Sequence, residues 1–176
     1  MGADRSIYWI RGSRIQELGG KDVIGDVDWA EALFKIQGDG GAGMIASAPL
    51  YRWAFWHDEL IQNASGATNK SVKNLIRIIE VLEPDYDFIQ RSSEEVCGME
   101  LVLVGEQKNF VLNREVSKEL IALSKEIVVC DVMKYYSPDD KTVKRRPVER
   151  SIYELVYGLS DSYYALDRQL VSSVYY

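Results

Sequence analysis

The chain has 176 residues, of which 47% are hydrophobic and 27% charged, and its formal net charge is −6 at pH 7. This composition is typical of a globular protein rather than a disordered or fibrous one. The acidity disfavours binding to a nucleic-acid backbone, and the sequence shows neither a signal-peptide pattern nor an apolar run of about 20 residues that could cross a bilayer. We therefore expect a cytoplasmic protein that binds neither nucleic acid nor a membrane.

The acidic charge lies in the first part of the chain. Residues 1–140 hold 15 basic and 23 acidic side chains, whereas residues 141–176 hold 6 and 4. An acidic body favours a basic protein as its partner. Because no export signal is present, Cys97 and Cys130 are predicted to be buried free thiols. The single histidine leaves a zinc site short of ligands, so neither a metal nor a cofactor is predicted.

The first predicted elements are a strand and a short helix. Residues 6–12 are rich in β-branched and aromatic side chains and end at a glycine, which favours a strand. Asp28 precedes Glu31 by three residues, as in a capping box, and apolar side chains recur with helical spacing over residues 29–36. A short amphipathic helix that ends at Gly38 is therefore predicted.

Gly38, Gly40 and Gly43 have the G-x-G-x-x-G spacing of a dinucleotide-binding loop. Such a loop follows a strand and opens a helix, so that the backbone can approach the pyrophosphate. Here the glycines follow a predicted helix, and Pro49 stands where the next helix would run. We interpret the segment as a flexible connector and predict no nucleotide site.

The middle of the chain contains a predicted strand, a loop and a helix. Residues 50–57 are dense in aromatic side chains, which favours a strand. The polar residues 62–69 indicate a loop. Ser71 is expected to cap a helix whose apolar stripe continues to Leu82.

The next segment has hairpin, helix and strand signals. Residues 99–112 form two apolar runs about a glycine-containing connection, which predicts a hairpin. Asn113 is expected to cap a helix over residues 114–126. The continuous apolar run at residues 127–133 is typical of a central strand.

The end of the chain has a helical pattern. Apolar side chains recur every three or four residues over residues 148–172, which predicts one long amphipathic helix. Gly158 is its expected weak point, at a cost of about 1 kcal/mol relative to alanine. Tyr153, Tyr157 and Tyr164 form a second stripe. Either this helix packs on its own domain, or the tyrosines bind a partner or a second copy of the chain.

Interleaved helices and strands indicate an α+β fold. We predict a two-layer sandwich of a mixed, mostly antiparallel sheet with helices on one face, plus a C-terminal amphipathic helix. Residues 1–140 are expected to form a single domain. Residues 141–176 are expected to form a basic linker and the C-terminal helix, which packs on the domain or on a partner.

Residues 6–133 resemble a bacterial family of unknown function, the one numbered 4279. The resemblance lies in the stretches DVDWAEALFKIQGD, YRWAFWHDE, NLIRIIEVLEP, NFVLNREVSKELIAL and EIVVCDV. The first loop is longer and richer in glycine than that pattern, and the tail lies outside it. The family brings no established activity. The resemblance implies a small acidic bacterial domain of the kind that often acts as an immunity protein beside a toxin.

The densest charge in the body is acidic and follows the helix that ends near Leu82. Its members are Glu80, Glu83, Asp85, Asp87, Glu94 and Glu95. Asp85 and Asp87 could hold a divalent ion, but the spacing and glycine of a calcium loop are missing, and aspartate is common in turns. A solvated turn and a docking patch for a basic partner both remain open.

His57 stands beside Asp58 and invites a general-base interpretation. Neighbours on a strand point to opposite faces, so Asp58 would not orient it. We therefore expect a non-catalytic protein-binding domain, namely an immunity protein that neutralises a basic toxin. Its expected contacts are the six carboxylates together with Tyr153, Tyr157 and Tyr164. The alternatives are a metal-dependent or hydrolytic enzyme using Asp85, Asp87 or His57, and a homodimer assembled through residues 148–172.

Overall fold

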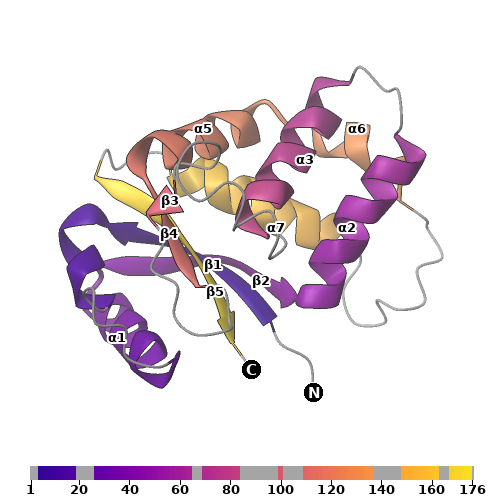
Figure 1. Cartoon of the computed structure of the whole chain (residues 1–176). Coiled ribbons are helices and arrows are strands. Elements are labelled where there is room, and N and C mark those ends of the chain that lie inside the picture. The colour runs from indigo at the N-terminus through magenta and orange to yellow at the C-terminus, as the bar shows by residue number, and fades with distance from the viewer. Residues whose placement is uncertain are drawn as a thin grey trace.

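The computed structural model describes residues 4–18, 26–64, 69–83, 99–100, 109–136, 148–162 and 167–175. These residues contain one antiparallel sheet with the strand order β2-β1-β5-β4-β3 (Figure 1). Its strands are β1 (Asp4–Arg11), β2 (Ala42–Pro49), β3 (Met99–Glu100), β4 (Phe110–Leu112) and β5 (Arg168–Tyr175). The α+β fold predicted from the sequence is confirmed, with helices packing on the sheet.

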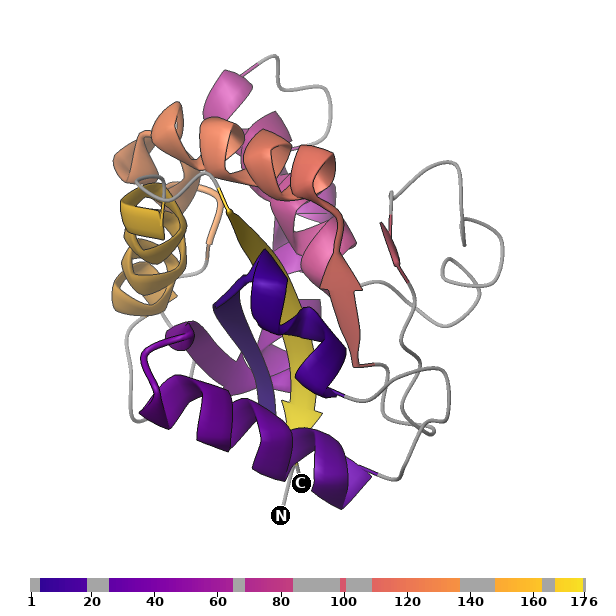
Figure 2. The same ribbon diagram turned by 90° about the vertical axis from the view of Figure 1, so that its left-hand side faces the viewer.

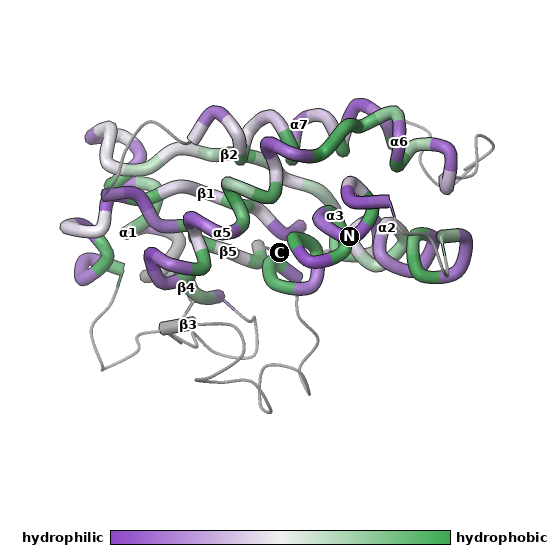
Figure 3. The backbone as a smooth tube through the Cα atoms, turned by 90° about the horizontal axis from the view of Figure 1, so that it is seen from above, coloured by the Kyte–Doolittle hydropathy of each residue, from purple (hydrophilic) through white to green (hydrophobic). Residues whose placement is uncertain are grey.

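Helices lie above and below the sheet. They are the 3₁₀ helix η1 (Gly12–Leu18), α1 (Asp26–Gly38), α2 (Leu50–Asn63), α3 (Lys70–Leu82), α5 (Arg114–Lys125), α6 (Val129–Met133) and α7 (Val148–Asp161). Figures 1 and 2 show α3, α5 and α7 over one face, while α1 lies below the other. Seen from above, α1 and α2 stand at opposite ends of the strands (Figure 3). The sequence predicts helices on one face of the sheet only, whereas α1 and η1 form a further layer on the other face (Figure 2).

Each face of the sheet has its own hydrophobic cluster, because successive side chains of a strand point to opposite faces. Ile7 and Leu170 belong to the larger cluster, which extends into the helices α2 to α7. Ile10 and Val171 belong to the smaller one, which includes Leu18, Leu33 and Ile36 from η1 and α1. The second layer is therefore held to the sheet by a core of its own.

The last described strand, β5, lies inside the sheet between β1 and β4. Tyr8 pairs with Val171, and Phe110 pairs with Ser172. The prediction of one helix over residues 148–172 is therefore wrong, because α7 ends at Asp161 and β5 begins at Arg168. The leucines of this region coincide with helical spacing, but pairing with two strands buries both faces of β5.

Three other segments differ from their predicted structure. Residues 50–57 lie in a helix, α2, rather than a strand. The aromatic side chains suggested a strand, yet Trp53, Trp56 and Leu60 lie on one helical face and are fully buried. Residues 127–133 are also not a strand, since α6 occupies 129–133. Residues 42–45, the last part of the predicted connector, belong to strand β2, which continues to Pro49.

Capping side chains define the starts of two helices. Asn69, not Ser71, caps α3, and its side-chain oxygen accepts hydrogen bonds from the backbone N–H of Ser71 at 2.8 Å and of Val72 at 3.4 Å. The predicted cap Asn113 is confirmed, since it accepts from the N–H of Val116 at 2.9 Å. The predicted hairpin is confirmed where β3 pairs with β4, whereas residues 101–108 lie outside the described residues.

Arg5 is fully buried on the face of the sheet that α3, α5 and α7 cover, which we call the helical face (Figure 1). Its guanidinium forms an ion pair with Glu83 and donates to the hydroxyl of Ser172 at 2.7 Å, while that hydroxyl donates to the carbonyl of Leu82 at 2.7 Å. Burial lowers the pKa of Arg5, and the nearby Glu83 carboxylate opposes that effect. The network joins β1, β5 and the end of α3.

Helix α7 packs against β2 at Gly158. A Cβ atom at this position would lie 2.7 Å from Ile45 Cγ2 and 2.9 Å from the Ile45 carbonyl oxygen. Ile45 falls at the register shift of β2, where Ile7 pairs with Ala46 and Tyr8 with Met44. Gly158 is therefore required for close contact with a β-bulge, rather than being only a weak point of its helix.

We predict that Glu83→Gln lowers the free energy of unfolding by roughly 3–5 kcal/mol, because it leaves a buried guanidinium without its counter-charge. The double variant Arg5→Met, Glu83→Leu should recover part of this loss. Urea denaturation of the native chain, Arg5→Met, Glu83→Leu and the double variant measures the coupling between the two side chains. Purely additive effects would show that the ion pair does not couple them.

We predict that Gly158→Ala lowers the free energy of unfolding by about 1–3 kcal/mol, because its methyl group would overlap with Ile45. Helix propensity alone would stabilise the alanine variant by about 1 kcal/mol, so the two effects have opposite signs. The matched control is Gly38→Ala at the end of α1, where a Cβ would meet nothing within 4 Å. Thermal or urea unfolding in which both variants gain stability would contradict the close contact.

Candidate functional site

A groove of about 500 Å³ lies between the second face of the sheet and α1. Its floor contains three serines in one row across three strands, since Ser6 pairs with both Ser47 and Ser173 in the register of the sheet. The hydroxyls of Ser6 and Ser47 are 2.8 Å apart and share a hydrogen bond. Adjacent strands therefore present a line of hydroxyls to the groove.

Ser173 completes this row. It lines the groove with only 8% of its surface exposed, and its hydroxyl forms no hydrogen bond within the described part of the chain. This hydroxyl is not among the fully enclosed unpaired polar atoms of the described residues, so it is accessible from the groove. The hydroxyl of Ser173 is therefore free to donate to, or accept from, a group that enters the groove.

Apolar side chains flank the polar floor. Phe34 on α1 is 76% exposed and Met44 on β2 is 52% exposed, and both line the groove. Their neighbour Leu33 lines it too but is buried in the core beneath α1. Exposed large apolar side chains around a cavity are typical of binding sites, because they gain from burial when a ligand covers them.

The charges of the groove are acidic. Asp4 and Glu31 line it from β1 and α1, and no lysine, arginine or histidine is among its described lining residues. Neither carboxylate forms an ion pair within the described residues. Partial burial raises the pKa of Tyr8, whose ring lies in the groove, while a hydrogen bond with Ser6 lowers it. Tyr8 therefore stays neutral at pH 7. The carboxylates of Asp4 and Glu31 are then the only charges among the described lining residues, and they attract a cation.

The position of α1, which forms one wall of the groove, depends on the glycine turn before β2. Gly40 has a φ of +78°, and the N–H of Gly41 donates to the carbonyl of Ile36 at 2.9 Å. A Cβ at Gly41 would lie 2.9 Å from Ile36 Cγ2 and 3.0 Å from Arg14 Nη1. The predicted flexible connector is therefore a tight turn that ends α1 and starts β2.

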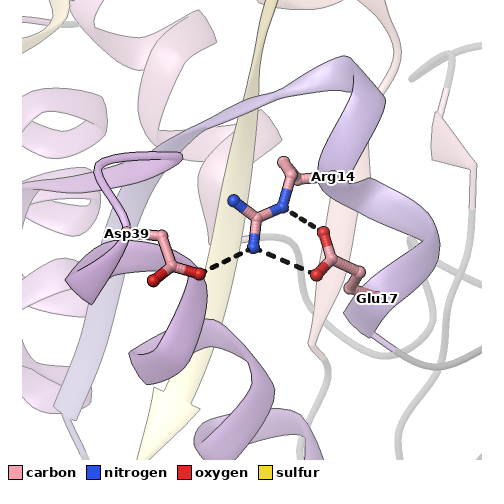
Figure 4. A network of polar contacts seen from close by, with 3 residues as sticks. All are labelled: Arg14, Glu17 and Asp39. Atoms are coloured by element: carbon pink, nitrogen blue, oxygen red, sulfur yellow. Dashed lines mark hydrogen bonds and ion pairs between the residues drawn. The ribbon is translucent and has the colours of Figure 1, made fainter.

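Arg14 holds this turn to η1 (Figure 4). Its guanidinium forms an ion pair with Glu17 through Nε, and its Nη2 donates to Glu17 Oε1 at 3.0 Å and to Asp39 Oδ2 at 3.1 Å. These hydrogen bonds raise the pKa of Arg14 and lower the pKa of Glu17. The network connects two segments that flank α1 and so positions that helix.

A smaller cavity of about 220 Å³ shares Met44 with the groove. It contains Trp9, whose ring lies 3.7 Å from the guanidinium carbon of Arg168 and also contacts Gly43. A side chain at Gly43 would lie 2.7 Å from Trp9 Cε2. Gly43, the third glycine of the motif in the sequence, thus makes room for a tryptophan and not for a pyrophosphate.

The predicted acidic docking residues are only partly placed. Glu80 Oε1 lies 2.9 Å from His57 Nε2, where it can accept a hydrogen bond from the ring. Glu83 forms an ion pair with the buried Arg5. Asp85, Asp87, Glu94 and Glu95 lie outside the described residues. Glu83 is therefore committed to the fold, and the docking patch as a whole stays a prediction.

The predicted tyrosine stripe is also partly placed. The rings of Tyr153 and Tyr157 stack at 5.2 Å with 9° between their planes, and Tyr157 is exposed. Partial burial raises the pKa of Tyr153, and the neighbouring Tyr157 raises it further. Tyr164 lies outside the described residues. Cys130 is exposed, which corrects its predicted burial, whereas Cys97 is not among the described residues.

His57 lies on α2 beside α3, and Glu80 of α3 contacts its Nε2 atom. Asp58 Oδ1 is 3.8 Å from its other ring nitrogen, Nδ1. No serine or cysteine hydroxyl or thiol contacts this ring among the described residues. In the same part of the chain, no three His, Cys, Asp or Glu side chains gather to hold a metal ion. None of the described helices has the length and apolar character needed to cross a membrane.

The groove residues were missed by sequence reasoning. Ser6, Ser47 and Ser173 are far apart in the chain. Ser47 follows the segment interpreted as a connector and Ser173 follows the helix predicted over residues 148–172, so the sequence patterns assign neither of them to a strand. The β-branched and aromatic side chains of Val171, Val174 and Tyr175 are a signal that could have indicated strand β5.

No family model matches the chain, and no curated protein or solved structure matches it either. The resemblance to family 4279 therefore stays a prediction, and the function rests on the geometry of the chain itself.

We predict that Glu17→Gln is less stable than the native chain at pH 7 and that the difference disappears in acid. Because the pKa of Glu17 is lowered in the fold, its ion pair stabilises the protein above the unfolded-state value of about 4.3 and is lost as the pH falls through the lower folded value. Urea midpoints at pH 7, 5 and 3 measure this. A difference that is independent of pH would contradict the role of the charged network.

Proposed function

We propose that this chain is a non-catalytic protein-binding domain that docks a basic protein partner over the groove between α1 and the sheet. The observation that carries the proposal is the exposure of Phe34 and Met44 on either side of a cavity whose only charged lining residues, among those described, are Asp4 and Glu31. Exposed large apolar side chains beside polar and charged groups are typical of protein interfaces.

The proposal has a specific form in the neutralisation of a toxin. An immunity protein covers or blocks its partner and needs no reacting group, which agrees with a groove lined by hydroxyls, carboxylates and apolar side chains. The acidic body adds long-range attraction for a basic toxin, which raises the association rate at low salt. The net charge of −6 supports this partner chemistry.

The enzyme alternative would use His57, which Glu80 could orient as a general base. His57 lies on α2, which stands at the other end of the strands from α1 (Figure 3), and His57 is not among the residues that line the groove. The alternative therefore requires a second, separate site. The homodimer alternative would use the stacked pair Tyr153 and Tyr157, since Tyr157 is exposed on α7.

The test places a photoreactive benzophenone amino acid at position 34 or 44 and, as a control, at position 61 or 128. Ile61 and Val128 are exposed apolar residues on the helical side of the sheet, at 48% and 51%. We predict that positions 34 and 44 crosslink one defined protein in the native host and that the control positions do not. The purified partner should then bind at a 1:1 ratio, with an affinity that falls as salt rises.

Co-expression provides the functional measurement. If the captured partner inhibits growth when it is expressed alone, this chain should restore growth, and Met44→Lys should reduce the rescue because it adds positive charge to the interface. Crosslinks of equal yield at positions 61 and 128, or crosslinks only between copies of this chain through α7, would overturn the proposal. If His57→Ala abolishes the rescue and Met44→Lys does not, the result would favour the enzyme alternative.

A further inference from the structure

The sheet side of the groove presents hydroxyl oxygens and a carboxylate on one face of three neighbouring strands. Asp4 lies two residues from Ser6 on the same face of β1, and Ser6 sits between Ser47 and Ser173 in the register of the sheet. Glu31 adds a second carboxylate from α1 on the opposite wall. A cation that enters between these walls can therefore meet a carboxylate on each side and hydroxyl oxygens beneath it.

The apolar side chains extend this arrangement toward solvent. Met44 pairs with Tyr8 in the sheet register, and both line the groove together with the exposed Phe34. A long side chain with an apolar stem and a charged head can bury its stem against such residues while its head reaches polar groups. The groove is therefore built for an amphipathic cation.

Of the two long basic side chains, arginine fits this lining better than lysine. The guanidinium is planar and carries five N–H donors, so one group can donate to Asp4 and to hydroxyl oxygens in the same plane. The ammonium of lysine is a compact and strongly hydrated charge with three donors. The guanidinium also stacks favourably on aromatic rings, and Tyr8 and Phe34 supply two.

We infer that the groove binds an arginine side chain of the protein partner, with Asp4 and Glu31 as counter-charges and the hydroxyls of Ser6 and Ser173 as additional acceptors. This inference rests on the proposed function, because it names the chemical group by which the partner is recognised. The unpartnered hydroxyl of Ser173 gives it support that does not depend on charge.

The test uses blocked heptapeptides of glycine and leucine with arginine, lysine, citrulline or glutamate at the centre. Citrulline keeps the shape of arginine but has no charge. Binding is followed by the backbone amide shifts of the full-length protein. We predict that the arginine peptide binds about three- to tenfold more tightly than the citrulline and glutamate peptides, and that the shifts are largest at residues 4–8, 44–47 and 171–173.

Two matched variants separate site charge from total charge. Asp4→Asn with Glu31→Gln should abolish the preference for arginine over citrulline. Asp58→Asn with Glu115→Gln changes the net charge by the same amount, on exposed residues of α2 and α5, and should leave the preference unchanged. Ser6→Ala should reduce the preference for arginine over lysine while leaving unfolding cooperative in urea.

The outcomes distinguish this inference from the proposed function. Citrulline or glutamate peptides that bind as tightly as arginine, or shifts confined to α2 and α7, would overturn the arginine site. If positions 34 and 44 nevertheless crosslink one partner, the binding function stands without it. If the arginine peptide binds but no protein is captured, the groove is a site for small cations, and both the partner and this inference fail.

Discussion

The buried guanidinium of Arg5 determines how three distant parts of this chain fit together. A charge without contact to water must have partners, and here they come from Glu83 after α3 and from Ser172 in β5. Ser172 in turn donates to the carbonyl of Leu82. The last strand can therefore occupy the centre of the sheet only in the register that brings Ser172 to Arg5. A polar network in the core thus specifies alignment, beyond any stability that it adds.

The same register builds the groove on the opposite face. When Arg5 meets Ser172 on the helical side, the neighbouring residues Ser6 and Ser173 face the groove and pair with each other. A one-residue slip of β1 would turn Ser6 toward the larger core and Arg5 toward α1. The candidate site is therefore a consequence of core alignment, although none of its lining residues belongs to the larger hydrophobic cluster.

The elements that could be predicted from the sequence are those whose pattern is local. Strand β1, helices α1, α3 and α5, the Asn113 cap and the β3–β4 pairing each carry their own signal in a few adjacent residues. The segments with wrong predictions depend on distant contacts. Trp53 and Trp56 belong to a helix because one face of α2 packs on α3 and the sheet, and β5 is a strand because β1 and β4 flank it. Gly158 likewise has a role that only its contact with Ile45 defines.

The site was harder to predict than the fold because a count of charges does not say which charges are already paired. Within the described residues, Glu83 and Glu80 from the predicted acidic patch lie against Arg5 and His57, so the folded chain already uses part of their charge. Asp4 and Glu31 form no ion pair in that part of the chain, and they share a cavity with exposed apolar side chains. An unpaired carboxylate keeps its full attraction for a cationic partner, whereas a paired one must first lose its internal contact. For this reason Asp4 on β1 and Glu31 on α1 are a better basis for the proposed recognition than Glu80 and Glu83, whose charges are already engaged within the fold.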